Sequence, residues 1–273
     1  ICAAGSALDI DTEGVDAYLY AWYPGECGGT AAAEILFGKS PSGKLPVTFY
    51  RNDAKLPDFT DYSMKGRTYR YADSADIIYP FGYGLSYADF EINDYCLESF
   101  DNKKLTISVQ VKNTGKVSGK EVVQVYVSLP GGNLEKEAHR LAAYAKTSEL
   151  KPDESEKVIV EIALEHLTSY DEKRAAWILE SGFYGIWIGN SLVDAKLCGG
   201  VKLDNEVILR QVKNLFPLKQ ELDEKTQTSG KTASRAKEAE KLAAEQKLNV
   251  AQLHAADFTT EVIEYKKNNE LCE

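Results

Sequence analysis

The sequence lacks the features by which several classes of protein are most easily recognised. It has no apolar run near the roughly 20 residues that a membrane-spanning helix requires. Basic residues are in deficit, since 32 Lys and Arg face 42 Asp and Glu, for a formal net charge of -10. Nucleic acids and anionic membranes attract basic surfaces, so we expect neither as a partner. No segment resembling a signal peptide opens the chain, which begins with Ile1, and we expect further residues to precede it.

Cysteine and histidine are few and scattered. The chain holds five cysteines that form no C-x-x-C pair: Cys2, Cys27, Cys96, Cys198 and Cys272. Its three histidines are equally isolated: His139, His166 and His254. This pattern supports neither a disulfide framework nor a zinc site. We therefore expect buried thiols in a reducing, cytoplasmic compartment, and neither a metal nor a cofactor.

The first 90 residues carry α/β signals. An apolar run at residues 15–22 stops at a proline-glycine turn and predicts a buried parallel strand. Thr30 is a suitable N-cap for a helix over residues 31–37, which Gly38 would end. A strand, a glycine turn and a helix make half of an α/β unit, so residues 1–90 are interpreted as an α/β remnant.

A long irregular segment follows. Residues 45–49 predict a strand at a sheet edge, because Pro46 has no N–H to donate. Residues 51–84 are rich in Tyr, Asp, Arg and Gly and lack a regular period. Loops of this length are uncommon unless they are functional or wrap over another domain.

From about Glu91 the pattern changes to β. Leu105, Ile107, Val109 and Val111 alternate with polar residues, as in a half-buried strand. Seven such short runs are separated by turn signals: residues 105–111, 121–129, 141–147, 157–164, 176–179, 183–188 and 196–203. This spacing predicts an all-β, immunoglobulin-like sandwich, and the missing cysteine pair favours its fibronectin type III-like variety.

The last part of the chain is more polar. Residues 204–218 predict a short amphipathic helix, and residues 220–246 predict a solvated helix or a linker. Ala, Glu, Lys and Arg favour helix over residues 234–246. We therefore divide the chain into an α/β remnant, a β-sandwich and a helical or linker tail: residues 1–90, 91–205 and 206–273.

Candidate chemical groups lie in the first part of the chain. Glu26 sits on a glycine loop after the predicted strand, as a catalytic carboxylate, a solvated residue or a partner of Arg67. The segment GRTYRY at residues 66–71 alternates basic and aromatic residues, for stacking on sugar rings or for clamping two domains together. Four carboxylates flank it, and two of them are candidates for an acid pair: Asp58, Asp61, Asp73 and Asp76. None of these patterns makes a complete catalytic set.

Four motifs together carry a family resemblance. The segment AWYPGECGGTAAAEILFGKSPSGKLPVTFY at residues 21–50 resembles the end of the C-terminal α/β-sandwich domain of glycoside hydrolase family 3. The motifs GRTYRY and YPFGYGLSY follow in the order that the family shows. The segment NTGKVSGKEVVQVYV then resembles the family's fibronectin type III-like domain. The resemblance covers about residues 1–205.

The resemblance implies a parent β-glycosidase that removes terminal β-linked glucose or xylose from oligosaccharides or glycosides with retention. In the family the nucleophile is an Asp of a barrel domain, and a Glu acid/base, where present, lies upstream of the W-Y-P-G turn. Neither position falls in this chain, so no catalytic residue is carried over, substrate-binding residues stay unknown and no metal is implied. The expected partners are the glycoside substrate and a barrel domain in cis.

We expect this fragment to be inactive alone. The alternative is a non-catalytic carbohydrate-binding or scaffolding module that keeps the same sandwich. The tail ending in NNELCE resembles the lead-in to a barrel in members of permuted domain order, or it is an unrelated helical extension. The sandwich is expected to fold alone, with residues 1–90 loosely held.

Overall fold

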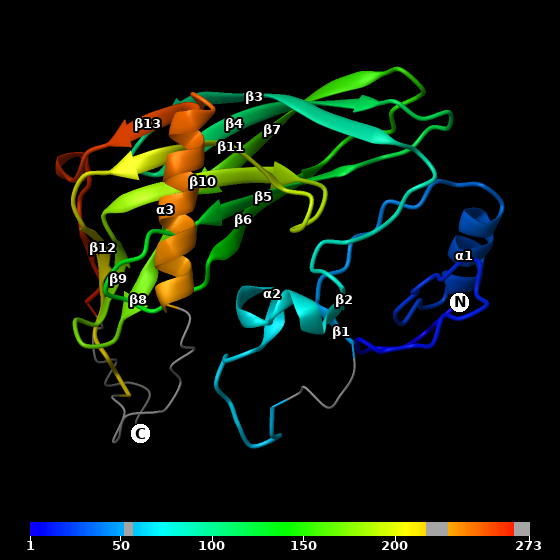
Figure 1. The fold of residues 1–273 in the computed structure, drawn as a ribbon, viewed down its shortest axis with the longest axis horizontal. Helices are drawn as coiled ribbons and strands as arrows, with labels where there is room; N and C mark the ends of the chain where they lie inside the picture. The colour runs from blue at the N-terminus through cyan, green and yellow to red at the C-terminus, as the bar shows by residue number, and fades with distance from the viewer. Residues whose placement is uncertain (52–56, 217–228, 265–273) are drawn as a thin grey trace, which may run out of the picture.

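The computed structural model describes residues 1–51, 57–216 and 229–264, and for residues 229–233 it describes the backbone only. A β-sandwich forms one end of an elongated body, and the α1–β2 segment lies at the other end (Figure 1). The described helices are α1 (Gly28–Leu36), α2 (Thr68–Tyr71) and α3 (Ser229–Glu245), with 3₁₀ turns at Ser74–Asp76, Leu164–Leu167 and Ala255–Asp257. The described strands are β1 (Phe49–Tyr50), β2 (Ile77–Tyr79), β3 (Phe90–Phe100), β4 (Lys104–Asn113), β5 (Val122–Ser128), β6 (His139–Lys146), β7 (Ser155–Ala163), β8 (Ser169–Asp171), β9 (Ala176–Leu179), β10 (Gly182–Gly189), β11 (Lys196–Leu203), β12 (Val207–Gln211), β13 (Asn249–Leu253) and β14 (Glu261–Val262).

The sandwich is built from three sheets. A five-stranded sheet of order β13-β11-β10-β5-β6 faces a three-stranded sheet of order β3-β4-β7, and a four-stranded sheet of order β14-β12-β9-β8 lies at one end. The predicted alternation of β4 and β5 supplies the core between the two main sheets: Leu105, Ile107, Val109, Val111, Val123, Val125 and Val127 are all nearly inaccessible. The predicted α/β remnant plus fibronectin type III-like sandwich is confirmed.

Strand β5 is buried on both faces. Gln124 and Tyr126 alternate with the core valines of this strand, and they too are nearly inaccessible, at 4% and 0% exposed. The segment that precedes β3 covers them, since Phe81 lies with its ring centroid 6.5 Å from that of Tyr126. The irregular segment therefore wraps the outer face of the sheet.

The start of the chain is less regular than predicted. Residues 15–22 form no strand, because only Tyr20 makes a parallel bridge, to Cys2, and Trp22 turns the backbone at φ 54°. Helix α1 begins at Gly28, three residues before the predicted start. Gly38 ends it as predicted, with φ 109°, and the amide of Lys39 donates to the carbonyl of Glu34, as in a Schellman motif.

The amphipathic helix predicted over residues 204–218 is wrong for its described part. Residues 207–211 form β12, which pairs antiparallel with β9. Val207 and Ile208 are β-branched, and a free edge of β9 gives their backbone hydrogen bonds that a short isolated helix would hold only marginally. Residues 217 and 218 lie outside the described residues.

The tail of the chain extends the sandwich. Helix α3 confirms the helix predicted over residues 234–246 and lies across the five-stranded sheet (Figure 1). An alanine stripe packs on Phe183 and Leu197 of that sheet: Ala239 and Ala243 are each 1% exposed. Strand β13 then pairs parallel with β11, so that β11, α3 and β13 form a crossover unit. None of the described helices is both long and apolar enough to cross a membrane.

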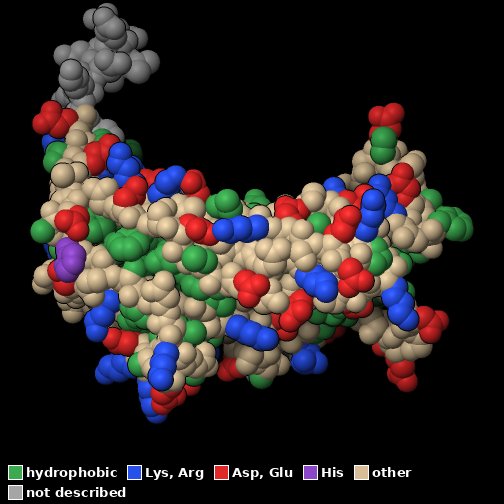
Figure 2. All heavy atoms as spheres, turned by 90° about the horizontal axis from the view of Figure 1, so that it is seen from above, with side chains coloured by type: hydrophobic (Ala, Val, Ile, Leu, Met, Phe, Trp, Pro, Cys, Tyr) green, Lys and Arg blue, Asp and Glu red, His purple; other side chains and the backbone are tan. Residues whose placement is uncertain are grey.

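Charge is evenly spread on the face seen from above. Figure 2 shows Lys and Arg side chains interspersed with Asp and Glu, and neither sign forms a continuous patch there. This face therefore presents no basic footprint of the kind that binds nucleic acid.

Candidate functional site

Two glycine-containing segments, at residues 43–45 and 82–84, contact each other through their backbones where the α/β segment meets the sandwich. We call this contact the joint. The amide of Leu45 donates to the carbonyl of Tyr83 at 2.8 Å, and the amide of Gly82 donates to the carbonyl of Leu45 at 2.8 Å. A Cβ added to Gly84 would lie 2.1 Å from the carbonyl oxygen of Gly43. Only glycine permits so close an approach, so Gly84 of YPFGYGLSY serves this backbone contact.

A buried ion pair fastens this joint to the sandwich. The ammonium of Lys44 lies 2.9 Å from the carboxylate of Glu121, and their side chains are 10% and 5% exposed. Lys44 also donates to the carbonyl of Gly84 at 3.0 Å, and Asn190 donates to Glu121 at 3.1 Å. Because both charges are removed from water, loss of either partner leaves the other uncompensated.

The GRTYRY segment packs against the outer face of β5. The ring of Tyr69 stacks on Phe81 with centroids 4.4 Å apart, and it also meets Tyr126 edge-on at 6.3 Å. The hydroxyl of Tyr69 accepts a hydrogen bond from the amide of Leu141 at 3.1 Å. This contact supports the clamp interpretation of the segment, because the tyrosine is occupied by protein.

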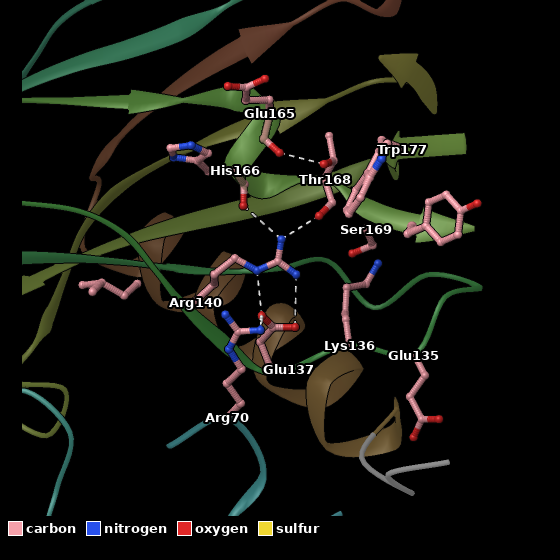
Figure 3. A pocket seen from close by; sticks show the side chains of 12 residues that line it. Arg70, Glu135, Lys136, Glu137, Arg140, Glu165, His166, Thr168, Ser169 and Trp177 are labelled. Atoms are coloured by element: carbon pink, nitrogen blue, oxygen red, sulfur yellow. Dashed lines mark hydrogen bonds and ion pairs between the residues drawn. The ribbon is translucent and has the colours of Figure 1, made fainter. Parts of the chain in front are cut away.

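A cluster of ion pairs next to this segment is formed by Arg140, Glu137 and Arg70, and we call it the hub. Arg140 binds Glu137 through Nε–Oε1 at 2.6 Å and Nη2–Oε2 at 3.1 Å, and Arg70 adds a contact at 3.4 Å. Arg140 also donates to the carbonyls of Thr168 and His166, at 2.6 and 3.0 Å (Figure 3). Burial alone would raise the pKa of Glu137, but the hydrogen bonds and charge of Arg140 outweigh it and hold that pKa below its usual value.

A hollow of about 470 Å³ opens beside this hub (Figure 3). It is lined by Arg70, Glu135, Lys136, Glu137, Arg140, Leu141, Glu165, His166, Thr168, Ser169, Tyr170 and Trp177. Its aromatic rim is accessible, since the side chain of Trp177 is 40% exposed. Glu137 is held ionised by guanidinium groups, so it is suited neither to donate a proton nor to attack a substrate. The arrangement is one for binding.

The carboxylates singled out from the sequence do not converge. Glu26 is exposed in the turn before α1, and Arg67 donates to the carbonyl of Asp61. Three of the four loop aspartates accept a hydrogen bond from the backbone amide two residues on, as in Asx turns: Asp58, Asp61 and Asp73. The carbonyl of Asp76 accepts from the amide of Arg51 at 2.8 Å. These residues shape the loop, and no described trio of His, Cys, Asp or Glu is placed to hold a metal ion.

The hub itself was missed from the sequence. Glu137 and Arg140 stand three residues apart at the start of β6, where a paired carboxylate and guanidinium are ordinarily taken for solvated surface charges. The signal was weak because their burial depends on Arg70, nearly 70 residues away in the chain.

Comparison with known proteins agrees with the geometry of the joint. The model of the glycosyl hydrolase family 3 C-terminal domain matches residues 1–87, and that of the fibronectin type III-like domain matches residues 121–192. The chain belongs to glycoside hydrolase family 3. The first match contains the joint's two glycine-rich segments and GRTYRY, and the second contains Glu121 and the hub residues Glu137 and Arg140.

Relatives of this family 3 chain include enzymes named for different glycosides. It is 41% identical over 196 residues to a xylan 1,4-beta-xylosidase of Xylanibacter ruminicola, covering 70% of this chain and 22% of that protein. It is 38% identical over 237 residues to beta-glucosidase A of Butyrivibrio fibrisolvens, covering 73% of this chain and 28% of that protein. The chain thus spans about a quarter of the length of these curated relatives.

Solved structures show the same arrangement. Beta-glucosidase 3B of Thermotoga neapolitana, solved with α-D-glucose, superposes with a TM-score of 0.61 at 36% identity, covering 68% of this family 3 chain and 28% of that one. A beta-glucosidase of Paenibacillus barengoltzii gives a TM-score of 0.63 at 31% identity, covering 71% of this chain and 24% of that one.

Proposed function

We propose that the chain is the C-terminal-domain part of a β-glycosidase that hydrolyses terminal β-linked glucose or xylose from oligosaccharides or glycosides with retention. The observation that carries the proposal is the similarity of about 70% of this chain to both a xylosidase and a β-glucosidase. The joint itself is held by Lys44 and Glu121 and by backbone hydrogen bonds of Leu45, which fix the α/β segment on the sandwich. In this proposal the chain positions a catalytic barrel domain and contributes neither carboxylate.

Two features of the site support the proposal that this chain contributes neither catalytic carboxylate. Retention needs two carboxyl groups only about 5–5.5 Å apart, one of which attacks while the other transfers a proton. The candidate aspartates serve turns in their own loop, and Glu137 is bound by Arg140 and Arg70. The substrate and the barrel domain are therefore the proposed partners, and the chain alone is proposed to be inactive.

Exposed apolar side chains support contact of residues 1–87 with a further domain of the parent enzyme. Thirteen exposed large hydrophobic residues lie in the described part of residues 1–87, including Phe37 at 91%, Phe59 at 92% and Tyr23 at 82%. So many exposed rings on a small segment are unusual for a surface that faces only water. A domain docked on this segment in cis accounts for them.

The test is hydrolysis of nitrophenyl β-glucoside and β-xyloside. This chain alone is expected to release no nitrophenol, with the full-length Thermotoga neapolitana beta-glucosidase 3B as the positive control. The same reading frame expressed with its flanking sequence is expected to be active on at least one of the two substrates, and the ratio of its rates decides between glucoside and xyloside. Nitrophenol release by this chain alone would refute the proposal that it contributes neither catalytic carboxylate. An inactive extended protein would refute the proposed β-glycosidase activity.

A further inference from the structure

The hollow beside the hub continues into a second one. The second hollow, of about 430 Å³, is lined by Lys104, Leu141, Ala142, Ala143, Tyr144, Glu161, Ala163 and His166. Leu141 and His166 line both hollows. The two hollows therefore adjoin beside β6, and we call them together the β6 groove. Each part has the size of an ordinary small-molecule site, so the whole suits an elongated ligand.

Aromatic rings stand at both ends of the β6 groove. Trp177 on β9 pairs directly with Tyr170 on β8, and their ring centroids are 5.2 Å apart at an interplanar angle of 50°. Tyr144 on β6 stands at the other end with 70% of its surface exposed. Flat rings of this kind pack against the apolar C–H faces of pyranose rings, with the sugar hydroxyls left at the edges for polar groups.

The charges of the groove cancel. The first hollow has three cations and three carboxylates, namely Arg70, Lys136, Arg140, Glu135, Glu137 and Glu165. In the second hollow Lys104 forms an ion pair with Glu161. A groove with balanced charge attracts neither a polyanion nor a polycation, but its ion-pair members offer donors and acceptors to hydroxyl groups. A neutral, hydroxyl-rich ligand fits best.

Hydrogen bonds and ion pairs connect the residues at the rim of the groove. Arg140 fixes the carbonyls of His166 and Thr168, between which the chain turns toward β8. Arg210 holds Glu165 from behind at 3.4 Å and is itself held by Glu261 at 2.7 Å. Polar groups held in place before binding lose little conformational freedom when a ligand arrives, so the groove is organised in advance.

We propose that the β6 groove is a binding site for a neutral β-linked oligosaccharide, with Trp177 and Tyr144 as the stacking platforms at its two ends. The choice of glucose- and xylose-based chains rests on the proposed function. In Figure 3 Trp177 and Glu165 lie at one rim of the first hollow, with Arg70 and Glu135 at the other. A bound chain would lie between these rims and continue past His166 toward Tyr144.

The test is calorimetric titration of this chain with cellohexaose and with xylohexaose. Saturable binding is expected for at least one of them. Substitution Trp177→Ala is expected to weaken this binding about tenfold, because the sugar ring loses both an aromatic stacking contact and the apolar area that it covers. Trp177→Phe should recover part of the loss, and Tyr144→Ala should weaken hexaose binding more than binding of the corresponding disaccharide.

Tyr62→Ala is the matched control, since Tyr62 is 83% exposed and lies outside both hollows. No saturation by either hexaose overturns the proposal, as does equal affinity of Trp177→Ala and Tyr62→Ala. Tighter binding of polygalacturonate than of both neutral hexaoses overturns the neutral ligand class. Because the readout is binding, failure here with nitrophenol release by the extended protein intact counts against the groove alone. Binding by the groove with no such release counts against the proposed enzyme alone.

Discussion

Protonation of His139 is predicted to loosen helix α3 from the sheet beneath it. His139 is the first residue of β6, and its ring lies edge-on to Trp187 with ring centroids 5.1 Å apart. It also lies within the electrostatic influence of Arg235 on α3. Burial, and secondarily the charge of Arg235, lower the pKa of His139 from 6.5 to about 4. The folded chain therefore holds this imidazole neutral at a pH where the unfolded chain protonates it.

The sign and size of the effect follow from this difference. The depressed pKa means that the stability is complete above pH 6.5 and is lost as the pH falls toward 4. Lowering the pH from 7.5 to 4.5 is then expected to cost about 2.5 kcal/mol of unfolding free energy from this residue alone. The loss should appear first at α3, because protonation places a cation beside Arg235.

The assay is urea denaturation at a series of pH values, followed by tryptophan fluorescence. Carboxylates also titrate in this window, so the informative quantity is the difference between the unsubstituted chain and His139→Phe, which keeps an aromatic ring against Trp187. His139→Phe is expected to lose about 2.5 kcal/mol less between pH 7.5 and 4.5. Identical pH dependence of the two proteins would refute the assignment of a neutral, buried imidazole.

Three further predictions concern the joint and the helix, and all are measured as changes in unfolding free energy. Lys44→Met is expected to cost about 3–5 kcal/mol, because it leaves Glu121 buried and uncompensated. The control Lys39→Met breaks an exposed pair with Glu34 and should cost at most about 1 kcal/mol. Equal losses for the two substitutions would contradict the burial argument. Gly84→Ala is expected to destabilise the joint by about 1–3 kcal/mol, because its Cβ would meet the carbonyl of Gly43 at 2.1 Å. The control is Gly43→Ala, which should change the unfolding free energy little, because no atom lies within 4 Å of its Cβ. Ala243→Arg places a cation against Phe183 and Leu197 and should cost more than about 2 kcal/mol. The control Ala244→Arg lies on the exposed side of the same helix and should change the unfolding free energy by no more than about 0.5 kcal/mol. Equal losses for the two substitutions would mean that α3 does not dock through its alanine stripe.

The sandwich was predictable because its signal is local. The alternation of β4 repeats every second residue, and the runs at residues 176–179 and 196–203 have the bounds of β9 and β11. Inward-facing Val, Ile and Leu need no knowledge of the rest of the chain to be recognised. The same reasoning identified Gly38 as the end of α1.

The features that were missed depend on partners far away in the sequence. Val207 and Ile208 lie in a strand because β9 offers them an edge, which overrides a weak helical period. The stripe of Ala239 and Ala243 was invisible as an apolar face because alanine is small, and its burial depends on the flat surface around Phe183. Likewise, the second buried face of β5 follows from Phe81 and its neighbours.

The motifs that carry the family resemblance converge on one place in the fold. Residues 43–45 contact residues 82–84, while GRTYRY, through Tyr69, covers the outer face of β5. Each motif supplies what that packing requires: glycines where backbones touch, and aromatic rings where a sheet face must be covered. Glu26 lies in the same family signature, yet it is exposed. A signature that identifies a hydrolase thus fixes, in this chain, the α/β segment on the sandwich, and the chemistry is proposed to belong to the barrel domain.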